Sequence, residues 1–291
     1  MNERNQRTIR RPIQFSGVTI FTNHEIHVRL LPADENTGIR FQRRDLPYLK
    51  PIPARIENAV FRHRRTAIEA GGASVEMIEH VMAALAGLQI DNCLVQLDGP
   101  EMPGLDGSCL ALVDGILAAG IVEQSTKAAR LSIQQAVDVA DDSASIQIEP
   151  PRDSDAKTTI GYSLDYGEES PIAAGSLEME ITPQTFADEI AAARTFVLES
   201  EVNAMRAHGY GKLLTSRDLL VFGPNGVIDN KLRWSDECIR HKILDCIGDL
   251  ALIGCELHGK VTASQSGHAL NRELVRAIQS SHSEASWVKA A

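Results

Sequence analysis

The chain has 291 residues, of which 43% are hydrophobic, and its formal net charge is −10. This length and composition suit two domains, or one large domain, with a packed core. The acidic charge argues against general nucleic-acid binding, because contact with phosphates needs a basic surface, although a local basic pocket remains compatible with it. The five cysteines are odd in number and form no CxxC pair, which argues against a disulfide framework and a cysteine-based zinc knuckle.

The N-terminal segment is polar and lacks the apolar core of a secretory signal. No stretch approaches the roughly 20 apolar residues that a membrane helix needs. We therefore expect a soluble, cytoplasmic protein with reduced thiols and without stable membrane insertion. No feature of the sequence calls for an obligatory protein partner.

The first half of the chain is predicted to begin with strands, over residues 17–33 and 39–45, and to end with helices. The first helix is predicted over residues 74–88, with Ser74 as its N-cap and Gly87 at its C-terminus. A strand over residues 91–99 and a turn-rich loop follow. The second helix is then predicted over residues 109–121.

Residues 122–131 are predicted to link two halves, which we assign as domains 1–124 and 125–291. The second half again opens with extended segments and closes with helices. Its strands are predicted over residues 144–150, 158–166, 176–183, 219–223, 226–230 and 259–264, and its helices over residues 184–196 (initially), 237–250 and 269–281. Strands before helices in each half indicate an α+β fold, with helices packed on antiparallel sheets. No sequence repeat relates the halves.

The predicted helix over residues 237–250 carries polar groups on an otherwise apolar surface. His241, Asp245 and Asp249 are four residues apart, so they lie on one stripe of the helix. Burying such groups costs several kcal/mol, roughly, unless they are paired or bind a metal. The HxxxD pair supplies two ligands from one helix face, by the same geometry as the two histidines of HExxH.

Two further clusters complete a candidate site. A catalytic zinc has three protein ligands and an open position, and His80 is the candidate third ligand beside His241 and Asp245. Glu79 adjoins His80 and can take a proton from water. His268, in "SQSGHALN" before a helix, can protonate a leaving amine.

Each of these features also has an ordinary explanation. A lone histidine in a helix is usually structural, and HxxxD is frequent by chance. Glu79 and His80 could lie at the solvent edge of their helix, and Asp249 could be an ordinary acid. We assign the other histidines, including His63, to the surface or to structural roles. Spacing alone does not establish that the three clusters meet.

The chain resembles the UDP-3-O-acyl-N-acetylglucosamine deacetylases, the zinc amidases of lipid A biosynthesis. The matching stretches are "TGIRF", "IPARIENA", "EHVMAALAGLQIDN", "PGLDGS", "ARTF", "IRHKILDCIGDL" and "SGHALN". They follow the order and spacing of that family over nearly the whole chain. The resemblance implies two similar α+β domains, each a mainly antiparallel sheet with two helices, packed helix to helix as a β-α-α-β sandwich with the active site between them.

The resemblance also implies roles for individual residues. These are zinc ligands at His80, His241 and Asp245, a general base at Glu79, a cationic His268 that helps the amine leave, Asp249 that orients His268, an oxyanion-stabilising hydroxyl at Thr195, and substrate contacts at Phe196 and Lys242. Iron(II) also fits such a mixed His/Asp site, because these ligands do not select zinc strongly.

Three substrate-side positions depart from the family pattern. The family's "GLHSG" is "TIFTN" here, so Phe21 replaces a histidine. The family's "GGS" corresponds to "LLT" at residues 213–215, and Gln265 replaces a lysine. We expect Phe21 and Gln265 to contact the substrate, with altered acyl-chain or diphosphate binding.

Three functions therefore remain open. The first is zinc-dependent hydrolysis of the N-acetyl amide of UDP-3-O-acyl-N-acetylglucosamine, which releases acetate. The second is the same amidase chemistry on another N-acetylated amino sugar. The third is a metal-binding protein without catalysis, against which the presence of Glu79 and His268 argues.

Overall fold

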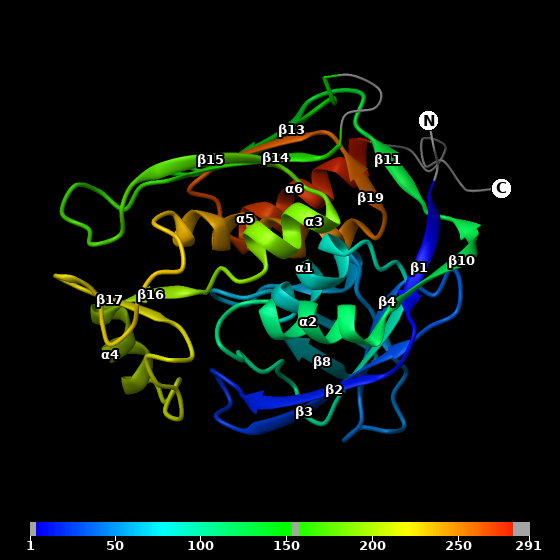
Figure 1. Ribbon diagram of the computed structural model, residues 1–291, viewed down its shortest axis with the longest axis horizontal. Coiled ribbons are helices and arrows are strands. Elements are labelled where there is room, and N and C mark those ends of the chain that lie inside the picture. Colours follow the sequence, from blue (N-terminus) through cyan, green and yellow to red (C-terminus); the bar gives the residue numbers. More distant parts are fainter. Residues whose placement is uncertain (1–3, 153–156, 282–291) are drawn as a thin grey trace.

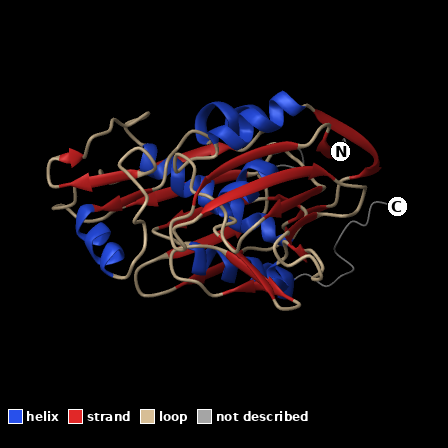
Figure 2. Ribbon diagram, turned by 90° about the horizontal axis from the view of Figure 1, so that it is seen from below, coloured by secondary structure: helices blue, strands red, loops and turns tan. Residues whose placement is uncertain are grey.

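The computed structural model describes residues 4–152 and 157–281. Two five-stranded sheets form outer layers, and the main helices lie between them (Figure 1). Most strands run along the long axis of the molecule (Figure 2). This arrangement confirms the predicted α+β class and the β-α-α-β sandwich that the resemblance implied.

The first sheet has the strand order β2-β3-β9-β4-β5, and the second has the order β12-β13-β20-β14-β15. In each sheet the central strand pairs antiparallel with one neighbour and parallel with the other. The two halves therefore share one topology although no sequence repeat relates them. The strands of the first sheet are β2 (Ile13–Val18), β3 (Glu25–Pro32), β4 (Ile39–Arg43), β5 (Ile52–Pro53) and β9 (Cys93–Leu97). Those of the second are β12 (Val137–Ala140), β13 (Ser145–Glu149), β14 (Thr159–Leu164), β15 (Gly175–Glu180) and β20 (Lys260–Ser264).

Short strands and turns complete each half. A three-stranded sheet beside the first half contains β6 (Ala59–Val60), β7 (Ala67–Ala70) and β8 (Ala73–Glu76). A second contains β16 (Phe196–Leu198), β17 (Leu220–Gly223) and β18 (Gly226–Val227). Two pairs are β1 (Asn5–Ile9) with β10 (Ile121–Lys127), and β11 (Arg130–Ser132) with β19 (Glu256–His258). The 3-10 turns are η1 (Ile56–Asn58) and η3 (Ala251–Ile253).

The helical layers bring distant parts of the chain together. The helices are α1 (Glu79–Gly87), α2 (Leu110–Ala119), α3 (Pro183–Thr185) running into the π-helical η2 (Phe186–Ile190), α4 (Glu199–Ala207), α5 (Glu237–Leu250) and α6 (His268–Ser281). Both α1 and α5 are buried along most of their length. They pack closely at Gly248, where an added Cβ would lie 2.1 Å from the backbone oxygen of Glu79. A glycine is required there because any side chain would force the helices apart.

The structure corrects the predicted start of the first helix. Ser74 lies in β8 and does not cap a helix, and α1 begins only at Glu79. The chain turns between these elements at Met77, whose φ of 60° is a left-handed conformation that costs free energy for a side chain of this size. Glu79 and His80 therefore lie in the first turn of α1, where the helix dipole favours negative charge.

Three other segments differ from the sequence predictions. The single strand predicted over residues 17–33 is divided, because β2 ends at Val18 and β3 begins at Glu25. Residues 122–131, predicted as a linker, form most of β10 and part of β11. Helix α4 was not predicted, and it has no buried residues, so it lacks the apolar stripe that identifies a core helix. The domain boundary between residues 124 and 125 stays a prediction. Within the described residues, every helix is too short or too polar to cross a bilayer.

Candidate active site

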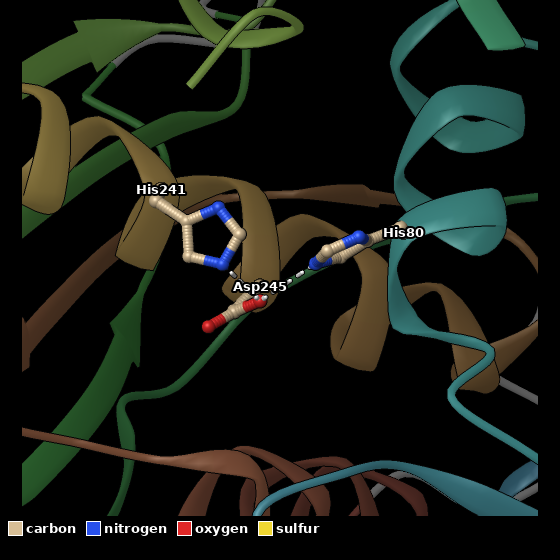
Figure 3. A group of neighbouring side chains, drawn as sticks. All are labelled: His80, His241 and Asp245. Carbon is tan, nitrogen blue, oxygen red and sulfur yellow. Dashed lines mark ion pairs between the residues drawn. The ribbon is translucent and has the colours of Figure 1, made fainter. Parts of the chain in front are cut away.

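Three buried side chains converge where α1 meets α5. His80 comes from α1, and His241 and Asp245 come from α5, and they point toward one another (Figure 3). Asp245 Oδ1 lies 3.5 Å from His241 Nε2 and 3.9 Å from His80 Nε2. One ligand atom from each residue falls within 4.8 Å of the other two, which is compact enough to hold a single metal ion.

The protonation states of this cluster suit a metal. Burial lowers the pKa of His80 to about 3 and also lowers the pKa of His241, so both imidazoles are neutral near pH 7. His241 Nδ1 lies 3.1 Å from the carbonyl oxygen of Ala193, which can only accept, so Nδ1 carries the proton and Nε2 keeps its lone pair. Burial raises the pKa of Asp245, but the surrounding charges, of which Lys242 contributes most, together outweigh burial and hold this pKa well below its usual range.

The donor set therefore fits a divalent metal of the zinc or iron(II) type. Two neutral imidazoles and one carboxylate are typical ligands of catalytic zinc sites, which leave a further position open. Lys242 Nζ donates to Asp245 Oδ2 at 2.8 Å, which leaves Oδ1 facing the two histidines. The second oxygen of Asp245 is thus held by a partner outside the cluster, as ligating carboxylates usually are.

Glu79 lies beside this cluster with one oxygen held in place. The backbone N–H of Thr66 donates to Glu79 Oε2 at 3.0 Å. Burial raises the pKa of Glu79 to about 7. A carboxyl group in this range can exchange a proton near neutral pH, which suits a general base or acid.

His268, at the start of α6, lies near the oxygen of Glu79 that Thr66 does not hold. Its Nε2 lies 3.9 Å from Glu79 Oε1, and its Nδ1 lies 2.8 Å from Asp249 Oδ2. Burial lowers the pKa of His268, but the carboxylates of Asp249, Asp245 and Glu79 outweigh it and raise this pKa to about 9. His268 is therefore a cation at neutral pH, and its proton on Nε2 is available to a group bound in the site.

Thr195 and Phe196 form another wall of the site. Thr195 directly precedes β16, and its N–H donates to the carbonyl oxygen of Gly107 at 2.7 Å. The backbone oxygen of Thr195 accepts from the N–H of Leu220 at 2.9 Å. The ring of Phe196 packs edge-on against His241, with centroids 6.2 Å apart. The backbone on both sides of Thr195 is therefore pinned.

Most of these side chains border one cavity of about 460 Å³. The predicted residues that line it are Phe21, Glu79, His80, Thr195, Phe196, His241, Lys242, Asp245 and His268. Asp249 is fully buried behind His268. Gln265 is exposed and lies outside the lining of this cavity, so its predicted contact with substrate stays a prediction.

The altered substrate-side segments lie at or near this cavity. The guanidinium carbon of Arg65 lies 3.7 Å from the ring centroid of Phe21, and the ring of Tyr210 meets Phe21 edge-on at 5.2 Å. Leu214 lines the cavity, whereas Leu213 is 56% exposed. Phe21 is therefore fixed by an aromatic and a cationic neighbour.

Sequence reasoning missed a basic segment of the cavity wall. Arg62, His63 and Arg64 line the cavity, together with Arg206 of α4. His63, assigned above to the surface or to structure, is exposed and borders the cavity. The run "RHRR" at residues 62–65 in an acidic chain was the available signal, because clustered basic residues indicate an anion site.

Comparison with known proteins identifies the family of this chain. Residues 6–280 match the family described as UDP-3-O-acyl N-acetylglycosamine deacetylase. Two relatives named UDP-3-O-acyl-N-acetylglucosamine deacetylase come from Geobacter sp. (strain M21) and Citrifermentans bemidjiense. The first is 40% identical to this chain over 272 residues, and the second is 38% identical over 271 residues. Each alignment covers 93% of this chain and 87% of the relative. A third relative of that name, from Xanthomonas euvesicatoria pv. vesicatoria, is 33% identical over 285 residues, or 97% of this chain and 93% of the relative. The chain belongs to this family of deacetylases.

Proposed function

We propose that this protein hydrolyses the N-acetyl amide of UDP-3-O-acyl-N-acetylglucosamine and releases acetate, with a zinc ion held by His80, His241 and Asp245. One observation carries the proposal. The three candidate ligands, a carboxyl group with a pKa of about 7 and an imidazolium with a pKa of about 9 border a single cavity. Family membership and the names of the relatives support the substrate.

The metal would supply Lewis-acid chemistry, which polarises the amide carbonyl and makes water more acidic. Glu79 takes the proton of the attacking water at Oε1, because Oε2 is already occupied by the N–H of Thr66. The hydroxyl of Thr195 donates to the oxygen that becomes negative when the carbonyl carbon turns tetrahedral.

His268 protonates the nitrogen of the leaving amine. Its Nε2–H donates a proton to the amide nitrogen, so the C–N bond breaks to a neutral amine and acetic acid, which releases its own proton to solvent and becomes acetate. Asp249 accepts from Nδ1–H of His268 at 2.8 Å, which directs the other ring nitrogen toward the cavity. Water supplies the proton that Glu79 takes and the oxygen that acetate gains, and the proton on Glu79 returns to His268 after amine release.

The cavity suits an amphiphilic, anionic substrate. Its wall combines apolar side chains, such as Phe61 and Met205, with the basic residues Arg62, Arg64 and Arg206. Arg62 forms an ion pair with Glu76, and Arg64 forms one with Glu201, so the diphosphate would share these two arginines with carboxylates. We assign the apolar part to the acyl chain and the basic part to the diphosphate. Lys242 lines the cavity, and we assign its ammonium group to a polar group of the sugar.

The test is release of free amine from UDP-3-O-(3-hydroxyacyl)-N-acetylglucosamine by purified protein, with and without a chelator. We expect turnover that the chelator abolishes and added zinc or iron(II) restores. Glu79→Gln keeps the shape of the side chain and removes the base, so it should lower kcat by at least about 100-fold. Undiminished hydrolysis by Glu79→Gln would contradict the proposed mechanism.

A second candidate is the same reaction on another N-acetylated amino sugar. Phe21, held between Arg65 and Tyr210, favours it, because an apolar ring stands where the family pattern has a histidine. A panel of N-acetyl amino sugars, with and without an O-acyl chain, separates the two. If the zinc-loaded protein does not hydrolyse the acylated UDP-sugar but deacetylates another amino sugar, this second candidate is correct.

A further inference from the structure

Thr66 lies between the candidate base and the candidate acid, and the mechanism above uses only its backbone N–H. It is fully buried and directly precedes β7. Its backbone N–H donates to Glu79 Oε2 at 3.0 Å, and its hydroxyl donates to Asp249 Oδ1. Asp249 is 183 residues away in the sequence, so Thr66 joins the first half of the chain to the second.

The direction of the hydroxyl hydrogen bond follows from a third partner. Nη1 of Arg272 lies 3.1 Å from Oγ1 of Thr66 and 3.2 Å from the backbone oxygen of Arg65. An arginine side chain can only donate, so the hydroxyl must accept from Arg272. Its single proton is then directed to Asp249 Oδ1. Arg272 is itself 2% exposed, and so this arrangement is shielded from water.

The hydrogen bonds of Asp249 show what the hydroxyl does. Oδ2 accepts from Nδ1 of His268 and from Nδ2 of Asn271, both at 2.8 Å, and Asn271 is held in turn by Ser266. Thr66 provides the hydrogen bond to the other oxygen, Oδ1. Because the terminal torsion of an aspartate is broad, a donor on each oxygen is needed to fix the carboxylate plane. The plane of Asp249 determines where His268 points.

We propose that Thr66 is a positioning residue that holds the base and the acid of the amidase reaction in one frame. Its N–H fixes Glu79, and its hydroxyl fixes Asp249 and, through it, His268. The two reacting groups are thereby aligned by a single residue, with Nε2 of His268 kept 3.9 Å from Oε1 of Glu79. This inference rests on the proposed function, because it concerns the geometry of that reaction.

The test compares Thr66→Val with Thr66→Ser. Valine keeps the shape and the backbone N–H but removes the hydroxyl, whereas serine keeps the hydroxyl. Thr66→Val should lower kcat about 10- to 100-fold, as expected for a lost hydrogen bond to a charged group, with KM changed less than about threefold. Thr66→Ser should restore kcat to within about threefold of the wild type. Zinc content should remain at one equivalent in both variants.

A second measurement does not depend on turnover or on metal. In the proton NMR spectrum of the metal-free protein, the Nδ1–H of His268 should resonate far downfield, because it donates to the carboxylate of Asp249. Its signal should be visible because burial of Asp249 slows exchange of this proton with water. Thr66→Val should shift or broaden this signal, and Thr66→Ser should leave it in place. If the Thr66→Val variant does not fold, the Thr66→Ala variant takes its place in both the kinetic and the NMR measurement.

The outcomes separate this inference from the proposed function. Wild-type kcat and an unmoved His268 signal in Thr66→Val would overturn the role of Thr66. Lower thermal stability with unchanged kcat would overturn it as well, because Thr66 would then be only structural. If the wild type does not hydrolyse the acylated UDP-sugar, the proposed function fails, whereas the His268 signal still reports whether Thr66 orients that ring.

Discussion

Gly248→Ala should disrupt the candidate metal site without changing any of its ligands. In α5, a Cβ on residue 248 would lie 2.1 Å from the backbone oxygen of Glu79 and 3.2 Å from the backbone nitrogen of Ala83. Real Cβ contacts essentially never fall below 3.0 Å, so α1 and α5 must separate by about 0.9 Å at this point. The atoms in the way belong to the backbone, and rotation of a side chain cannot relieve the clash.

The separation of α1 from α5 would pull the three candidate metal ligands apart. Glu79 precedes His80, so moving the first turn of α1 moves His80 away from His241 and Asp245 on α5. A misplacement of about 1 Å in a catalytic constellation can cost about 100-fold in rate. Overpacking of this kind also costs roughly 1–3 kcal/mol of unfolding free energy.

The assays are zinc affinity by competition with a chelator, amide hydrolysis, and urea unfolding. Gly115→Ala in α2 is the matched control, because it also replaces a helical glycine, and its Cβ would meet only Cδ1 of Ile13 at 3.5 Å. The control should gain up to about 1 kcal/mol from helix propensity and keep its zinc. Wild-type zinc affinity and turnover in Gly248→Ala would refute the reasoning.

Three further predictions concern single side chains. The rate of amide hydrolysis should fall as pH rises through about 9, where His268 loses the proton that it donates. Asp249→Asn should move this fall to lower pH, because the carboxylate of Asp249 is the main group that raises the pKa of His268. An unchanged pH profile in that variant would contradict the pairing. Asp245→Ala should lose most of its bound zinc by elemental analysis, and full occupancy would disprove the ligand assignment. Arg194→Gln should lower the unfolding free energy by about 3–5 kcal/mol in urea, because it leaves the fully buried Glu237 without its charged partner; a change below about 1 kcal/mol would show that the pair is dispensable.

Local geometry explains which parts of the site could be predicted from the sequence. His241, Asp245 and Asp249 share a stripe because a helix repeats every 3.6 residues, and that spacing is visible in one dimension. Alternation and turn residues likewise indicated most strands of the two sheets. His80 and Glu79 were candidates because they adjoin one another in a predicted helix, and the resemblance to the deacetylases added Thr195 as the oxyanion residue.

Other features depend on contacts between distant segments. The left-handed turn at Met77 was not visible in a helical pattern that continued smoothly back to Ser74, so the helix start was misplaced. The basic run at residues 62–65 was passed over because nothing local shows that its first three residues border a cavity.

The sequence by itself determined the two-half α+β organisation and the ligand spacing on α5, because both follow from periodicities of a few residues. Only the tertiary structure decided that Gly248 lets α1 approach α5, and that Thr66 bridges Glu79 and Asp249. These contacts join residues far apart in the chain, and their free energy comes from packing and from buried hydrogen bonds that no local pattern encodes.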